Sequence, residues 1–261
     1  MSFPTVYIPH GGGPWPWVPA WQEPHAQLRR YLEALPASLP APKAILVVSA
    51  HWEERKPTVT TAAQPGLLYD YGGFPADTYN LSWRAPGSPA LAARVRELLG
   101  AAGIDSAEEA ERGLDHGAFV PLAVSWPKMD IPVVQLSLIF GLDPAAHLEL
   151  GRALAPLREE GVLILGSGMS YHNMGGFFSP GGQAAAQAFD QWLADSLSSP
   201  MERWQSLKNW ANAPGGRSSH PREEHLLPLM VIAGAAGEDP VRITMRGQVL
   251  GKPVLAAEFG G

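Results

Sequence analysis

The sequence predicts an α/β fold, namely a single three-layer α/β/α domain with a central mostly parallel sheet. Short apolar runs alternate along the chain with amphipathic helical patterns, which is the order that parallel sheets produce. The runs are rich in β-branched residues and bounded by Gly or Pro, as strands buried on both faces are. Neither an internal repeat nor a long polar linker divides the 261 residues, so we expect one domain over residues 1–261.

The strands are expected in the following order. The clearest run reads AILVVS and follows a proline-rich stretch, and the runs IPVVQLSL and VLILG predict two more strands. A weaker, alternating segment near the C-terminus predicts the last one. The expected ranges are Ala44–Ser49, Ile131–Leu138, Val162–Gly166 and Val241–Met245.

Helical patterns occupy the intervals between these strands. Their apolar residues recur at the spacing of one helix face. One of them has an explicit start signal, because Ser88 is a good N-cap and Pro89 suits the first helical position. The expected ranges are Trp21–Leu35, Ser88–Ala102, Pro144–Glu160, Gln183–Leu197 and Glu224–Ala235.

Composition excludes several kinds of chemistry. The chain has no cysteine, which rules out disulfides, thiol nucleophiles and metal sites with thiolate ligands. Its formal net charge of -6 argues against a nucleic-acid partner, because such surfaces are basic. The first residues do not show the basic, apolar pattern of a leader, and no apolar run reaches about 18 residues. We therefore expect a cytoplasmic protein without a membrane partner.

The histidines are the most informative of the polar residues. Three of the 8 histidines, His10, His51 and His172, follow apolar runs and are flanked by Gly, Ser or Ala. Because ligands bind at the carboxyl ends of the strands in open α/β sheets, we expect these three side chains at a site. We expect His116 in a loop before an apolar stretch, and His225 at the start of the last helix.

Several imidazoles without a thiolate suit Zn, Fe, Cu or Ni, and the residues alone do not separate these metals. Acidic residues near the histidines are candidate carboxylate ligands, although such residues are usually surface groups. These are Glu53, Glu54, Glu223 and Glu224. We expect His25 and His147 on solvent-exposed helix faces, and the context of His220 favours neither role.

Rival chemistries have weaker signals. The glycines at 11–13 lack the Lys-Ser/Thr ending of a phosphate-binding loop and the spacing of a dinucleotide motif. The turn at 166–170 does not match the G-x-S-x-G pattern of a serine hydrolase. Neither segment therefore predicts phosphate binding or a nucleophilic serine.

A set of short motifs makes the sequence recognisable. In chain order they are PHGGGP at 9–14, VVSAHW at 47–52, YGGFP at 71–75, APGSP at 85–89, GLDHG at 113–117, IPVVQLS at 131–137, YHN at 171–173 and EHLLPL at 224–229. Together they resemble the extradiol aromatic ring-opening dioxygenases of the protocatechuate 4,5-dioxygenase catalytic-subunit type. The closer similarity is to the DOPA 4,5-dioxygenase-like branch, and it extends over nearly the whole chain.

The resemblance implies roles for individual residues. His10, His51 and His225 would hold a divalent metal, with His225 in the place of a carboxylate ligand of the wider family and Glu224 as the alternative ligand. His172 matches the family's acid/base histidine, and in the closer branch it also lies among the metal ligands.

Two further residues receive roles from the same resemblance. His116 matches a histidine that contacts the substrate or dioxygen and would act in catalysis with His172. Tyr171, in the YHN motif, is expected to contact the substrate. Three neutral histidine ligands would make the site more cationic by one charge than a set with a carboxylate, which favours an anionic catecholate.

The implied activity is metal-dependent extradiol cleavage of a small catechol, DOPA-like or a related phenolic acid, by O2 to a muconic semialdehyde. Fe(II) is the metal expected for activity, and Zn(II) can occupy the same site. The alternative is a zinc-dependent hydrolase or a small-molecule-binding protein on the same scaffold. A homodimer is compatible with a loop-rich apolar surface, and we expect the loops Gln64–Tyr79 and Asn173–Gly182 to set substrate selectivity.

Overall fold

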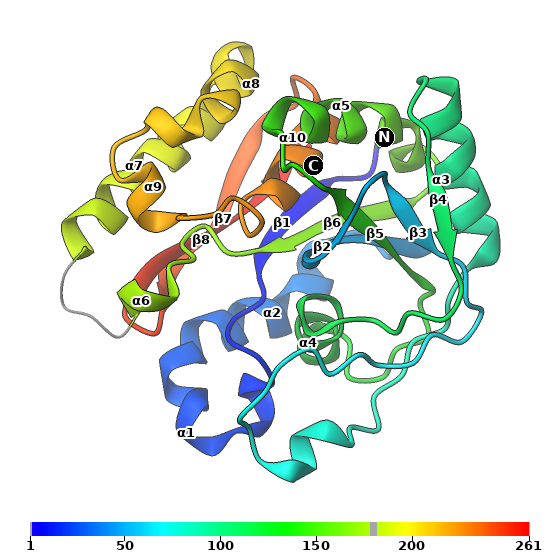
Figure 1. Ribbon diagram of the computed structural model, residues 1–261, viewed down its shortest axis with the longest axis horizontal. Coiled ribbons are helices and arrows are strands. Elements are labelled where there is room, and N and C mark those ends of the chain that lie inside the picture. Colours follow the sequence, from blue (N-terminus) through cyan, green and yellow to red (C-terminus); the bar gives the residue numbers. More distant parts are fainter. Residues whose placement is uncertain (1, 178–181, 261) are drawn as a thin grey trace.

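The computed structural model describes residues 2–177 and 182–260. Its strands form one eight-stranded sheet in the order β4-β3-β5-β2-β6-β1-β8-β7 (Figure 1). The strands are β1 (Thr5–Pro9), β2 (Ala44–Glu54), β3 (Thr58–Thr60), β4 (Ala107–Glu109), β5 (Val133–Ile139), β6 (Val162–Gly168), β7 (Val241–Val249) and β8 (Lys252–Phe259). No helix of the described residues is both long and apolar enough to cross a membrane.

Helices connect these strands. They are α1 (Pro19–Gln22), α2 (Ala26–Ser38), α3 (Pro89–Ala101), α4 (His116–Ser125), α5 (Pro144–Leu154), α6 (Met174–Phe177), α7 (Gln183–Ser198), α8 (Pro200–Lys208), α9 (Gly216–Ser219) and α10 (Leu227–Ala236). Short 3-10 helices are η1 (Trp15–Trp17), η2 (Glu23–His25), η3 (Ala76–Tyr79), η4 (Ala155–Arg158) and η5 (Trp210–Asn212).

The centre of the sheet is parallel, as the sequence predicted. β5, β2, β6 and β1 run side by side in one direction, while β8 is antiparallel to β1 and β3 is antiparallel to β5. The carboxyl ends of β1, β2 and β6 therefore meet at one edge of the sheet, so residues that follow these three strands are brought close together.

Each face of the sheet is covered by helices. Along β2, Leu46 and Val48 pack into the core under α3, α5 and α10, whereas Ile45 and Val47 pack into the core under α2 and α4. Figure 1 shows these two helical layers on opposite sides of the strands. Both faces of the central strands are apolar for this reason, which explains the continuous apolar runs in the sequence. The three-layer α/β/α prediction is confirmed.

Two candidate site histidines lie in different local structures from those that the sequence predicted. His116 is the first residue of α4 rather than a loop residue, and Asp115 caps this helix. His225 precedes α10, which begins at Leu227 rather than at Glu224. The expected boundary was wrong because the apolar pattern continues through the turn that enters the helix.

The prediction that His25 and His147 are solvent-exposed was wrong. Both side chains are fully buried. His25 Nδ1–H donates to the Trp21 carbonyl at 2.7 Å, and its Nε2 accepts from the Gly12 N–H at 3.1 Å. His147 makes an equivalent pair of bonds to backbone groups. A neutral imidazole with both nitrogens satisfied can be buried at low cost, and polar neighbours in the sequence do not reveal such pairing.

Candidate metal centre and active site

A cavity of about 210 Å³ opens where β1, β2 and β6 end. All five candidate histidines line it, together with a glycine-rich loop and a set of mostly apolar side chains. The lining residues are His10, Gly11, Gly12, Gly13, Trp21, His51, Tyr71, Phe74, His116, Met169, His172, Met174, Phe177, His225, Val249 and Leu250. The structure thus brings together residues that are more than two hundred positions apart in the chain.

The ends of two strands position the first two histidines. His10 directly follows β1, and its N–H donates to the Gly168 carbonyl of β6 at 3.1 Å. His51 lies in β2 within the register shift between Val48 and Glu53, where the regular pairing with β5 is interrupted. Such an irregularity redirects a side chain out of the sheet's alternation.

His225 is held through its backbone. Its carbonyl accepts hydrogen bonds from the Met169 N–H at 2.9 Å and from the Tyr7 hydroxyl at 3.1 Å. The close approach requires glycine at 168, because a Cβ there would lie 2.2 Å from the same carbonyl oxygen. The turn before α10 is therefore fixed against β1 and β6.

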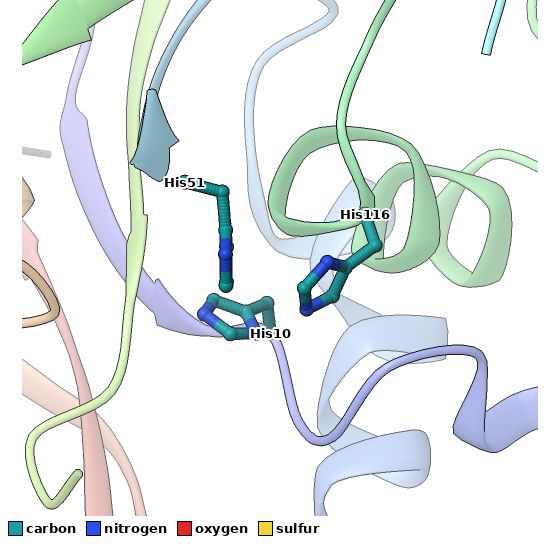
Figure 2. Close-up of side chains that lie close together, drawn as sticks. All are labelled: His10, His51 and His116. Atoms are coloured by element: carbon teal, nitrogen blue, oxygen red, sulfur yellow. The ribbon is translucent and has the colours of Figure 1, made fainter. Parts of the chain in front are cut away.

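The five imidazole rings form one cluster. The ring centroids of His10, His51 and His225 lie 4.9, 4.9 and 5.2 Å apart. His116 lies 3.9 Å from His51, and His172 stacks on His225 at 3.3 Å with an interplanar angle of 12°. Figure 2 shows three of the rings, those of His10, His51 and His116, converging from the end of β1, from β2 and from the start of α4.

The nitrogens on the far side of the rings have oxygen partners. His10 Nδ1–H donates to the Gly11 carbonyl at 2.8 Å, and His225 Nδ1–H donates to Glu224 Oε1 at 3.0 Å. His116 Nδ1–H donates to Asp70 Oδ1 at 2.8 Å. A ring that donates through Nδ1 carries its lone pair on Nε2, which is the form that binds a metal or accepts a proton.

Three buried Nε2 atoms have no hydrogen-bond partner in the described residues, and they belong to His10, His51 and His225. A buried polar atom left without a partner costs about 1–3 kcal/mol, so its presence needs an explanation. A divalent metal would satisfy all three nitrogens at once. The residues therefore fit a metal of the kind that prefers imidazole ligands, and the chain has no thiolate to compete.

Ligand atoms of neighbouring residues also gather in two groups within which all distances are 4.8 Å or less. One group is His10, His51 and His116, and the other is His172, Glu224 and His225. Among the histidines of these groups, a buried Nε2 without a partner in the described residues belongs to His10, His51 and His225, which favours this set over either group.

The three histidines with unpartnered Nε2 atoms are held neutral. Burial lowers the pKa of His10 and His225 well below the usual value of 6.5, and the neighbouring histidines lower it further. Burial, followed by the nearby His116, lowers the pKa of His51 to about 3. Neutral imidazole is the protonation state that coordinates a metal, so the site is prepared for one at neutral pH.

Sequence reasoning missed Asp70. It lies in the loop before the YGGFP motif, and its carboxylate faces both His116 and His51. Burial raises the pKa of Asp70, but the hydrogen bonds and charges of the two histidines outweigh this effect, and the pKa is lowered overall. Asp70 directly precedes the YGGFP motif, and this position was the only indication in the sequence that it could belong to the site.

The Glu224 carboxylate contacts the Nδ1 atoms of two histidines, on the side of each ring opposite to Nε2. Its Oε1 contacts Nδ1 of His225 at 3.0 Å and Nδ1 of His172 at 3.5 Å. Burial raises the pKa of Glu224, but the hydrogen bond to His172 and nearby positive groups lower it overall. A carboxylate in this place orients histidines without needing to bind the metal itself.

Both segments expected to set substrate selectivity contribute side chains to the cavity, as far as they are described, and their effect on selectivity stays a prediction. Tyr71 and Phe74 of the first loop and Met174 and Phe177 of the second line the cavity, while residues 178–181 lie outside the described part of the chain. Tyr171 is buried beside the cavity with its ring edge-on to Phe177 at 5.2 Å, and its substrate contact stays a prediction.

The known proteins that are similar to this chain are described as dioxygenases of one type. A family model described as the catalytic LigB subunit of aromatic ring-opening dioxygenase matches residues 5–252. A 4,5-DOPA dioxygenase extradiol of Beta vulgaris is 47% identical over 201 residues, which cover 76% of this chain and 75% of that protein. One of Escherichia coli K12 is 38% identical over 238 residues, covering 88% of this chain and 87% of that protein.

Other relatives extend the similarity to the whole chain. A dioxygenase of Hapsidospora irregularis is 37% identical over 281 residues, covering 99% of this chain and 86% of that protein. The crystal structure of an uncharacterised Escherichia coli K12 protein matches with a TM-score of 0.77 and 34% identity over 99% of this chain and 100% of that one. The resemblance that the motifs indicated is confirmed.

Proposed function

The chain belongs to the family of the catalytic LigB subunit of aromatic ring-opening dioxygenases and is an extradiol dioxygenase, and from this premise we propose that it cleaves a small catechol at a metal held by His10, His51 and His225. The product is a muconic semialdehyde, and the substrates are an aromatic diol and O2. DOPA, which names several relatives, and related phenolic acids are the first candidates. Residues 1–261 serve as one catalytic domain.

One observation carries the proposal. The three histidines that the motifs single out as ligands are the ones whose buried Nε2 atoms lack a partner in the described chain. A bound Fe(II) would supply a redox-active centre with open positions for the two catechol oxygens and for O2. The same nitrogen ligands would also suit Zn(II), which is redox-silent and would support only hydrolysis or binding.

The other two histidines handle protons in this proposal. His172 and His116 line the cavity beside the ligand set. His172 takes the proton that a catechol hydroxyl loses on binding, and His116 contacts the substrate and assists the later proton transfer. Both rings lie within reach of the cavity without being required as ligands.

The walls of the cavity bind the ring and exclude water. Trp21, Phe74, Met174 and Phe177 offer flat or flexible apolar surfaces to an aromatic substrate. The glycines at 11–13 leave room beside His10, because side chains there would collide with aromatic neighbours. A substrate ring held between these groups would present its hydroxyls to the histidine cluster.

The test is anaerobic reconstitution with Fe(II), followed by DOPA or catechol and air. We expect oxygen uptake with a yellow semialdehyde product, lost in His51→Ala and His172→Ala. His147→Gln, which changes a buried histidine outside the cavity, is the matched control and should keep the activity. Absence of oxygen uptake with iron demonstrably bound, across a broad catechol panel, would count against the proposal and favour the zinc-dependent alternative.

A further inference from the structure

A carboxylate lies behind two of the cavity histidines, on the side away from the cavity. Asp70 Oδ1 accepts hydrogen bonds from both the Nδ1–H and the backbone N–H of His116, at 2.8 and 2.9 Å. Its second oxygen lies 3.5 Å from Nδ1 of His51. Since the Asp70 side chain is only 18% exposed, these contacts are its immediate surroundings rather than one of many surface conformations.

A second carboxylate repeats the arrangement on the other side of the cavity. Glu224 Oε1 lies 3.0 Å from Nδ1 of His225 and 3.5 Å from Nδ1 of His172. Its other oxygen faces Arg222 at 3.3 Å, which holds the carboxylate in this orientation. Each carboxylate thus faces one histidine of the proposed ligand set and one of the proposed acid/base pair.

The arrangement determines the tautomer of the rings. A histidine that donates its Nδ1–H to a carboxylate keeps the Nε2 lone pair free, and the carboxylate raises the basicity of that nitrogen. The Nε2 atoms of His51 and His225 are among the buried nitrogens without a partner. The carboxylates therefore favour the required orientation of His51 and His225, while His10 is oriented by the Gly11 carbonyl.

We propose that Asp70 and Glu224 are positioning residues that divide the histidine cluster between them, Asp70 acting chiefly on His116 and Glu224 chiefly on His225. Each carboxylate is assigned to the histidine that it contacts at the shorter distance, 2.8 Å for Asp70 and His116 and 3.0 Å for Glu224 and His225. The inference rests on the proposed function, because it gives His225 to the metal and His116 to the substrate. Neither carboxylate touches the substrate or the metal in this scheme.

The first test measures metal affinity, which needs no catalysis. Zn(II) and, under anaerobic conditions, Fe(II) are titrated against a chelator with the full-length protein and its variants. Glu224→Gln should weaken binding about 10–100-fold, the usual effect of removing a carboxylate behind a metal-bound histidine. Asp70→Asn should change it much less, because His51 is the more distant of its two partners.

Matched controls replace neighbouring acids whose described hydrogen bonds and ion pairs do not involve the five cavity histidines. Glu223→Gln removes a carboxylate that pairs with Arg217, and Asp77→Asn changes an exposed acid in the same loop as Asp70. Both should leave metal affinity unchanged. If Glu224→Gln does not fold, Glu224→Asp takes its place, since it keeps the charge but withdraws the oxygens and should weaken binding in the same direction.

The second test reads the tautomer of His116 from 15N chemical shifts in the zinc-loaded, diamagnetic protein. The wild type should show the Nδ1–H form, and Asp70→Asn should show a mixture, which a purely structural role would not produce. In the iron-loaded enzyme the same variant should lower kcat at saturating metal while metal affinity is nearly kept.

The outcomes are distinguishable from failure of the proposed function. Absence of catechol cleavage by a metal-loaded wild type would overturn that function while the affinity and tautomer results still test the two carboxylates. Metal affinity of Glu224→Gln within about twofold of wild type, equal losses in both variants, or an unchanged His116 tautomer in Asp70→Asn would each overturn the proposed division.

Discussion

At the scale of single residues, His225 decides the charge of the site. In the proposed ligand set a neutral histidine takes the place of a carboxylate, and burial together with nearby histidines keeps the pKa of His225 well below 6.5. A metal bound by three neutral histidines would retain its full charge. In a buried site the effective dielectric constant is low, so the attraction between that charge and a bound anion is strong.

The variant His225→Glu tests this effect of charge. We expect it to retain metal but to bind catechol less tightly, with KM raised roughly tenfold, because one unit of positive charge is lost within a few ångströms of the catecholate. Metal content and KM are measured on the same preparation, with His147→Gln as control. Unchanged catechol affinity in a variant that keeps its iron would contradict the expectation.

His25, which accepts a hydrogen bond from the glycine-rich loop, makes the stability of the fold depend on pH. Burial lowers the pKa of His25 to about 4 in the folded protein, against about 6.5 in the unfolded chain. The unfolded state therefore binds the proton more readily. The folded state has its full stability above about pH 6.5 and loses some as the pH falls from there towards 4.

Unfolding free energies measured between pH 7 and pH 4 test the role of His25. Because this single group accounts for roughly 3 kcal/mol over that range, His25→Gln should flatten the decline by about that amount. Glutamine keeps an acceptor for the Gly12 N–H and does not titrate. Parallel stability curves for wild type and variant would show that the loop tolerates a charged His25.

At the scale of elements, the contact between β6 and the turn before α10 sets the position of His225. Gly168→Ala should destabilise the fold by about 1–3 kcal/mol and weaken metal binding, because the new Cβ would meet the His225 carbonyl at 2.2 Å. Gly100→Ala in α3, where nothing lies within 4 Å of the Cβ, is the control. Equal effects of the two changes on thermal unfolding and on chelator competition would rule out this account.

Sequence patterns revealed some elements and not others. The central strands were predictable because both of their faces are buried, and α3 was predictable from Ser88, whose side chain accepts from the Leu91 N–H. The helix α4 was missed because it is buried on nearly every side and contains Pro121, so it has no amphipathic period. The strand β8 was missed because its alanines and Pro253 are poor strand signals.

The candidate site was predictable to a similar extent. The five histidines could be identified from motifs, since each lies in a short segment of distinctive composition. Their carboxylate partners could not be identified, because the contact of Asp70 with His116 joins positions 46 residues apart and has no local pattern. Pairings of this kind depend on the fold as a whole.

At the scale of the whole molecule, the cavity is assembled from distant segments. Its apolar walls come from the segment around Trp21, the loop around Phe74, the helix α6 and the turn at Leu250. Among the described residues that line it, the polar side chains are the five histidines and the Tyr71 hydroxyl, and none is Lys, Arg, Asp or Glu. The Tyr71 hydroxyl donates to the Thr78 carbonyl at 2.6 Å and is thus already engaged.

Among the candidate DOPA-like catechols and phenolic acids, this lining predicts lower activity for those whose carboxylate is attached directly to the ring. A carboxylate attached directly to the ring would be buried against apolar walls without a cationic partner, which costs several kcal/mol. The kcat/KM of protocatechuate should therefore lie about 100-fold or more below that of 4-methylcatechol. DOPA should fall between them, because its flexible chain lets the charged groups extend towards the cavity mouth. Oxygen uptake with the three substrates on one iron-loaded preparation measures the order, and protocatechuate performing as well as 4-methylcatechol would mean that a cation reaches the ring in the working enzyme.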